Sequence, residues 1–119
     1  MKLYVCGPMT GLPEFNYPAF RTAAERLTAA GYPVESPAGE LVDGWGWSDY
    51  MRRALGLLVQ CQGVAVLAGW QTSRGARIEA KLAQDLGMVV APVDEWLRRA
   101  EAGAVDLIGV GAIDDRARP

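Results

Sequence analysis

One seven-residue segment, Ser73-Arg74-Gly75-Ala76-Arg77-Ile78-Glu79, holds the side chains with the clearest chemical potential in this sequence. It follows an apolar run and opens a predicted helix, so Ser73 and Gly75 stand at a helix N-terminus. Free N–H groups and the helix dipole favour an anion such as phosphate there. Ser73 also suits a plain N-cap. The segment therefore predicts either a phosphate-binding turn or an ordinary helix start.

Glu79 lies on the apolar stripe of that predicted helix. It shares a face with Leu82, Ala83 and Leu86, which follow at three, four and seven residues, and such a face turns toward the core or a cleft. No lysine or arginine stands three or four residues away to form a surface ion pair. Burying an unpaired carboxylate is costly unless its pKa rises or it gains partners. We expect a functional role for Glu79, with a structural buried carboxylate as the alternative.

The sequence contains no histidine, which narrows the chemistry that Glu79 can serve. Ser-His-Asp and Cys-His pairs, HExxH zinc sites and imidazole acid–base catalysis are all excluded. A carboxylate beside a phosphate-binding helix start suits attack on a sugar anomeric carbon, through a covalent glycosyl ester that water or a second base resolves. A second acid normally protonates the departing base. Asp49 is the candidate by position, and a surface pair with Arg53 at a helix start is the alternative.

The cysteines and the charge balance exclude further classes. Cys6 and Cys61 are far apart and each lies in an apolar stretch, so we expect both to be buried and reduced, with no metal site and no cofactor. The net charge is −2 and no basic patch is present, which argues against polymeric nucleic acid as a partner. With no long apolar run and no signal peptide, we expect a cytoplasmic protein without a membrane partner.

The elements that must position these residues alternate along the 119-residue chain. Strands are predicted at 2–6, 32–36, 63–69 and 88–93, and helices at about 17–30, 48–60, 74–86 and 94–102. The expected N-caps are Asn16, Ser48, Ser73 and Asp94, and Gly103 is expected to end the last helix. Residues 105–113 are expected to form a fifth strand or a docked tail, and 114–119 a frayed polar tail.

This order predicts one α/β domain over residues 1–113, an open parallel sheet of four or five strands with helices on both faces. Ligands bind such sheets beyond the carboxyl ends of the strands, so the loops after the first and third strands matter most. The glycines of Gly7-Pro8-Met9-Thr10-Gly11 let backbone N–H groups approach an anion, or simply form a tight turn. Trp45, Trp47 and Trp70 fall in predicted loops, where they can stack on a nucleobase or pack as a lid.

Four stretches carry a family resemblance: residues 2–11, 14–20, 49–53 and 69–79. Together they closely resemble the DUF4406 family of small proteins of undefined function, over Met1 to about Arg99. That family is similar to nucleoside 2-deoxyribosyltransferases and to 2′-deoxynucleoside 5′-monophosphate N-hydrolases, mainly through the first glycine loop and the Ser-x-Gly-x-x-x-Glu spacing. The family usually has aspartate where this chain has Ala54 and Gln62, and the first of these aspartates matches the active-site acid of the enzymes.

The resemblance implies a flavodoxin-like or Rossmann-like sheet and a homodimer or higher homo-oligomer with sites near the subunit interface. It places Glu79 at the nucleophilic glutamate, Ser73 and Gly75 at the phosphate- or ribose-binding turn, and residues 7–11 at the substrate loop. The expected catalytic residues are Glu79 and Asp49, and the expected substrate-binding residues are Gly7, Pro8, Met9, Thr10, Gly11, Asn16, Trp70, Ser73 and Gly75.

The expected function is hydrolysis or transfer at the N-glycosidic bond of a small (deoxy)nucleoside or nucleoside 5′-monophosphate. Glu79 is the expected nucleophile in this nucleoside-deoxyribosyltransferase-like domain. The alternative is a non-catalytic nucleotide-binding or sensing protein that kept the pocket and lost the acid at Ala54.

Overall fold

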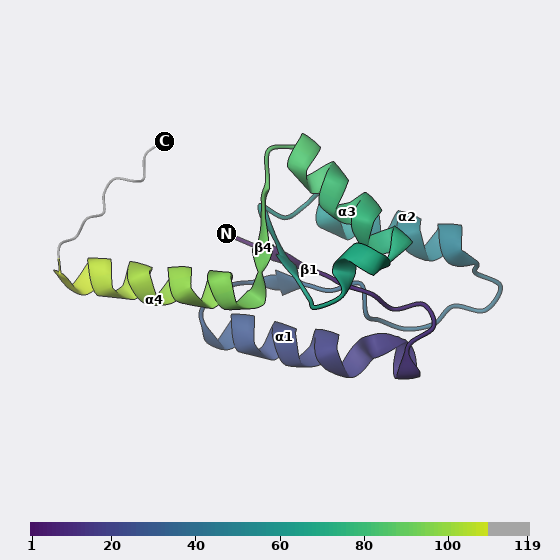
Figure 1. Ribbon diagram of the computed structural model, residues 1–119, viewed down its shortest axis with the longest axis horizontal. Coiled ribbons are helices and arrows are strands. Elements are labelled where there is room, and N and C mark those ends of the chain that lie inside the picture. The colour runs from purple at the N-terminus through teal and green to yellow at the C-terminus, as the bar shows by residue number, and fades with distance from the viewer. Residues whose placement is uncertain (110–119) are drawn as a thin grey trace.

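Four parallel strands form the central sheet of the computed structural model, which describes residues 1–109 of the chain (Figure 1). The strands lie in the order β2-β1-β3-β4, with Leu3 of β1 opposite both Val34 of β2 and Gly63 of β3. Parallel neighbours need long crossover connections, and helices provide them here. The strands are β1 (Leu3–Cys6), β2 (Val34–Glu35), β3 (Gly63–Val66) and β4 (Val89–Pro92).

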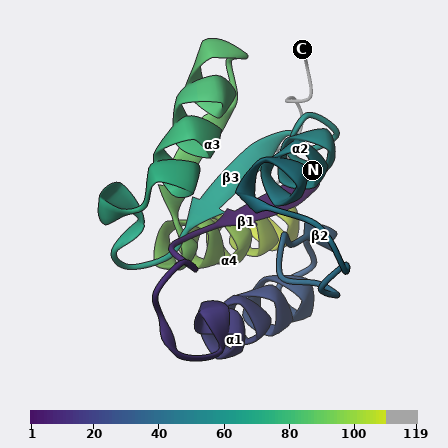
Figure 2. The ribbon, with the colours of Figure 1, turned by 90° about the vertical axis from the view of Figure 1, so that its right-hand side faces the viewer.

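Helices cover both faces of the sheet, so the predicted open α/β sheet of flavodoxin-like type is confirmed (Figure 2). Helices α1 and α4 pack on the face that carries Leu3 and Val5, while α2 and α3 pack on the face that carries Tyr4 and Cys6. Both central strands are therefore buried along their whole length. The helices are α1 (Tyr17–Ala29), α2 (Trp47–Leu58), α3 (Arg74–Asp85) and α4 (Val93–Gly109), with short 3-10 turns η1 (Pro13–Asn16) and η2 (Trp70–Thr72).

The prediction for the C-terminal part is wrong in two respects. Helix α4 continues through Gly103, and residues 105–109 extend it instead of forming a fifth strand. A single glycine lowers helix stability by only about 1 kcal/mol and does not have to end a helix. The helix also begins at Val93, so Asp94 lies in its first turn and is not its N-cap. Residues 110–113 and the predicted tail at 114–119 lie outside the described part of the chain.

Other element boundaries also differ from the prediction. Strand β3 ends at Val66, three residues before its predicted end. Strand β2 has only two residues, Val34 and Glu35, and pairs with β1 at one edge of the sheet. Helix α2 begins at Trp47 with Gly46 as its N-cap, in place of Ser48. The carboxylate of Asp49 accepts the Gly46 N–H at 2.9 Å, which satisfies a free backbone donor at this helix start. No helix among the described residues is long and apolar enough to cross a membrane.

Trp96 of α4 packs against strand β3, which leads to the Ser73 segment. Its indole is 1% exposed, and its Nε1 donates a hydrogen bond to the Val64 carbonyl oxygen at 2.9 Å. The ring lies directly over Gly63, where an added Cβ would come within 2.7 Å of the indole. Gly63 is therefore required by the close approach of this indole to the strand.

We expect Gly63→Ala to lower the free energy of unfolding by about 1–3 kcal/mol, because the added methyl overpacks the core against Trp96 and Leu3. Urea denaturation measures the change. The matched control is Gly56→Ala in α2, where an added Cβ meets nothing within 4 Å. That substitution is expected to raise stability by up to about 1 kcal/mol through helix propensity. Equal midpoints for Gly63→Ala and the parent protein would contradict the packing argument.

Candidate functional site

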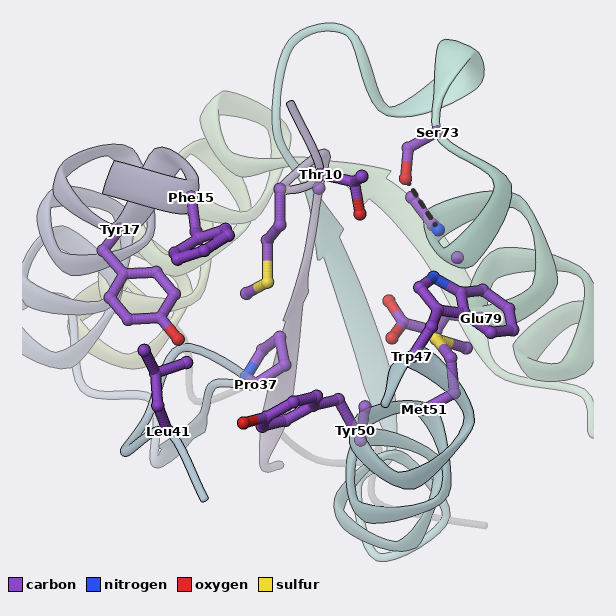
Figure 3. A pocket seen from close by; sticks show the side chains of 15 residues that line it. Thr10, Phe15, Tyr17, Pro37, Leu41, Trp47, Tyr50, Met51, Ser73 and Glu79 are labelled. Atoms are coloured by element: carbon purple, nitrogen blue, oxygen red, sulfur yellow. Dashed lines mark hydrogen bonds between the residues drawn. The ribbon is translucent and has the colours of Figure 1, made fainter. Parts of the chain in front are cut away.

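A cleft of about 190 Å³ opens beyond the carboxyl ends of β1, β2 and β3 (Figure 3). This is the edge of an open parallel sheet at which ligands bind. The wall residues come from six segments: the loop after β1, η1, the start of α1, the loop after β2, one face of α2 and the beginning of α3 with its N-cap. They are Gly7, Met9, Thr10, Phe15, Tyr17, Pro37, Leu41, Trp47, Tyr50, Met51, Ala54, Ser73, Gly75, Ala76 and Glu79.

Glu79 lines this cleft from the second turn of α3 and is 5% exposed, which confirms its predicted place on the inward face. Its Oε2 accepts a hydrogen bond from the Tyr4 hydroxyl at 2.9 Å. Burial raises the pKa of Glu79 to about 7, and hydrogen bonding by Tyr4 and then Cys6 opposes that rise. The carboxyl therefore exchanges between charged and neutral forms near neutral pH.

Tyr4 is a site residue that the sequence interpretation missed. It sits in an apolar strand whose alternate residues face opposite layers, and it faces α3 from beneath. Burial, followed by the charge of Glu79, raises the pKa of Tyr4 well above its ordinary value, so the hydroxyl remains a neutral donor. A fully buried tyrosine needs a partner for its hydroxyl. This requirement could have predicted the pair from the sequence, because Glu79 is the buried acceptor that the Tyr4 hydroxyl needs.

Cys6 lies beside this pair but is held as an unreactive thiol. Its Sγ donates to the Ala76 carbonyl oxygen at 3.4 Å, and burial raises the pKa of the thiol far above its ordinary value. Thiolates are the reactive form of cysteine, so this group is chemically quiet. Cys61 is also buried, and neither cysteine forms a disulfide, as predicted.

Ser73 caps α3 as predicted, because its Oγ accepts the Ala76 N–H at 3.2 Å. Among the described hydrogen bonds the Ser73 hydroxyl donates none, so it can donate one to a ligand. Gly75, two residues later, is needed for the packing of α2 against α3. An added Cβ there would lie 3.1 Å from the Met51 Sδ, so glycine allows α2 to pack closely on α3.

The loop after β1 contributes Gly7, Met9 and Thr10 to the cleft. Gly7 is buried against the loop after β3, since an added Cβ would come within 2.8 Å of the Leu67 side chain. Pro8 does not line the cleft. It lines an adjoining hollow that Thr10 shares and that also includes Arg74.

Three more of the expected substrate-binding residues do not line the cleft: Asn16, Gly11 and Trp70. Asn16 occupies the N-cap position of α1, yet its side chain makes no cap and its Nδ2 donates to the Pro8 carbonyl oxygen at 3.0 Å. Gly11 forms a turn with a φ of +83°. Trp70 packs against the buried cluster between the sheet and α2 and α3.

Asp49 is also absent from the cleft wall, because its carboxylate caps α2 through Gly46. The predicted alternative, a pair with Arg53, does not form either. Arg53 donates to the Glu40 carbonyl oxygen at 3.1 Å, and its guanidinium lies 5.3 Å from the ring centre of Trp45. Both side chains instead stabilise the start of α2 and the loop before it.

Aromatic side chains form much of the wall, and the sequence interpretation found only part of this surface. Trp47, expected in a loop, opens α2 and lines the cleft together with Tyr50 and Met51. Phe15 of η1 and Tyr17 at the start of α1 also line the cleft, with ring centres 6.0 Å apart. The helical spacing of Trp47, Met51 and Ala54 predicts that they share one face of a helix. The contribution of η1 depends on long-range packing, which local spacing does not predict.

The described residues contain no cluster of three or more histidine, cysteine, aspartate or glutamate side chains that can hold a metal ion. The cleft wall itself offers the Glu79 carboxyl, hydroxyl groups, backbone N–H groups and aromatic rings.

Residues 1–92 match the family described as Domain of unknown function (DUF4406). The chain belongs to the DUF4406 family. The matched segment includes every residue that lines the cleft of this DUF4406 protein, from Gly7 to Glu79. A comparison with curated proteins finds no match.

We expect the stability of this protein to fall as pH rises from about 5 to 7, because Glu79 binds its proton more tightly in the folded chain. Its folded pKa of about 7 exceeds the ordinary value of 4.5, so between these values the folded state holds more protons than the unfolded state. The full effect is on the order of 3 kcal/mol, reached above pH 7. Urea denaturation at each pH measures it.

Glu79→Gln is expected to remove most of this slope, while the exposed Glu25→Gln on α1 leaves it in place. Tyr4→Phe should move the end of the slope to higher pH, because the lost hydrogen bond had favoured the charged carboxylate. A slope that survives unchanged in Glu79→Gln would show that another group causes it.

Proposed function

We propose that this cleft binds a small (deoxy)nucleoside or nucleoside 5′-monophosphate and that Glu79 cleaves its N-glycosidic bond. The proposal rests on one observation: a carboxylate that is 5% exposed lines an open cleft and has a hydroxyl, not a cation, as its partner. Burying such a group lowers stability, so a structural role alone gives little reason to retain it.

In the proposed reaction, the ionised carboxylate of Glu79 attacks the anomeric carbon as the base departs, through an oxocarbenium-like transition state. The Tyr4 hydroxyl donates to Oε2, so Oε1 is the oxygen that we assign to the attack. A covalent glycosyl ester results, and water or a second base resolves it. Hydrolysis and transfer share every step up to this ester.

The start of α3 supports anchoring of the sugar or its phosphate. The Ser73 hydroxyl and the N–H groups of the first turn lie at the positive end of the helix dipole. The aromatic wall supplies surfaces for a planar base. By resemblance to the enzymes named above, we also propose a cytoplasmic homodimer or higher homo-oligomer.

A nucleotide-binding or sensing protein is the second candidate function, and one observation favours it. The face of α2 opposite Glu79 presents Trp47, Met51 and the Ala54 methyl, and Ala54 is 3% exposed. Among the described residues that line the cleft, Glu79 is the single carboxylic acid. No second acid on this wall can protonate a departing base.

The experiment is chromatographic detection of free base released from nucleosides, deoxynucleosides and their 5′-monophosphates. We expect Glu79→Gln to lower turnover by about 1,000-fold or more while the ligand still binds, because the nucleophile is lost but the cleft remains. The exposed Glu25→Gln variant is the control and keeps full activity.

The rate kcat is expected to rise with pH through about 7, since attack needs the ionised form of Glu79. Full turnover by Glu79→Gln would refute the nucleophile. If no substrate releases base but one nucleotide raises the melting temperature, the binding protein is favoured instead.

A further inference from the structure

The two ends of the cleft differ in chemistry. Figure 3 shows Phe15, Tyr17 and Leu41 at one end and Glu79, Trp47 and Met51 at the other. The tyrosine hydroxyls of the aromatic end are already engaged. Tyr17 donates to the Gly39 carbonyl oxygen at 2.9 Å, and the Tyr50 hydroxyl accepts the Val42 N–H at 2.8 Å. A base at this end therefore meets ring surfaces and few free hydrogen-bonding groups.

The charged groups at and near the cleft wall favour one class of ligand. None of the described wall residues is lysine or arginine, and Glu79 is the single carboxylate among them, so its ionised form attracts a positively charged ligand. Wall rings also bind planar cations within the protein itself. The guanidinium of Arg74 lies 4.3 Å from the ring centre of Trp47, and that of Arg53 lies 5.4 Å from the ring centre of Tyr50, although neither arginine lines the cleft.

The wall also limits which bases can leave. Glu79 is the nucleophile of the proposed reaction, so it cannot protonate the base in the same step. The α2 face opposite Glu79 ends in the Ala54 methyl, and the remaining hydroxyls, those of Thr10 and Ser73, are weak acids. A neutral base leaves slowly without a general acid, whereas a base that is already cationic leaves as a neutral molecule.

We propose that the preferred substrate is the N-glycoside of a cationic heteroaromatic base, such as a pyridinium or an N-alkylated purine. This inference rests on the proposed role of Glu79 and adds the class of leaving group. The aromatic end holds the cationic ring, and the carboxylate faces the anomeric carbon.

The reaction balances without an added acid. The bond from the anomeric carbon to the ring nitrogen breaks, and its electron pair neutralises the positive charge of the base. A carboxylate oxygen of Glu79 forms the new bond to the anomeric carbon. Water then hydrolyses the ester, which returns the carboxylate, frees the sugar and releases one proton to solvent.

The test compares cationic and neutral substrates with the full chain at pH 7. The cationic probes are nicotinamide riboside and 7-methyl-2′-deoxyguanosine, each also as its 5′-monophosphate. The neutral probes are the common nucleosides and deoxynucleosides and their 5′-monophosphates. We expect kcat/KM for a cationic probe to exceed that for every neutral probe by at least about 100-fold, the usual contribution of a general acid.

Two variants test the two parts of the argument. Phe15→Leu, at a side chain that is 47% exposed, is expected to weaken binding of nicotinamide riboside about fivefold. Binding of its neutral dihydro form should change less, because the lost contact acts on charge. Ala54→Asp places an acid on the α2 wall and should raise release of neutral bases at least tenfold, with Ala54→Asn as the matched control for packing.

Each outcome decides between the two proposals. Glu79-dependent release from cationic probes, with neutral probes at least about 100-fold slower, supports both. Release from neutral probes within tenfold of cationic ones overturns the inference and leaves the proposed function standing. No release from any probe overturns the proposed function and the inference with it. The wild-type comparison holds even if Ala54→Asp fails to fold.

Discussion

The hydrogen bond from Tyr4 to Glu79 is the constraint on which the site depends. It joins the central strand β1 to helix α3 inside the protein, with the carboxylate facing an open cleft. In a low-dielectric surrounding such a bond is strong, and so is the penalty for leaving the carboxylate without it. Two further contacts hold the helix that carries Glu79 in place: Ser73 caps its start, and Gly75 allows α2 to approach it closely.

The family relationship and the geometry answer different questions. Membership of the DUF4406 family relates residues 1–92 to other chains of undefined function, and it assigns no chemistry. The chemistry comes from one buried acid, a helix start with a free hydroxyl and a wall of aromatic rings. A fold of this type hosts many activities, so the function depends on these groups and not on the fold alone.

Local patterns predicted the sheet, the four helices and the inward position of Glu79, because each depends on short-range periodicity. The same reasoning failed at residues 105–109, where a short apolar run fits a strand and a helix equally well. It also missed Tyr4 as the partner of Glu79, since 75 positions separate the two residues. The aromatic wall depends on packing between η1, the loop after β2 and α2, which no single segment encodes.

The loop that carries Pro37 and Leu41 has a consequence for how fast ligands exchange. It is tied on one side by Tyr17 to Gly39, and on the other by Arg53 to Glu40 and by Tyr50 to Val42. Each bond contributes only about 1 kcal/mol, but widening the cleft at this wall breaks them together. Opening is then a concerted event of the whole loop. Residence times should accordingly follow the lifetime of the closed loop more than the strength of any single ligand contact.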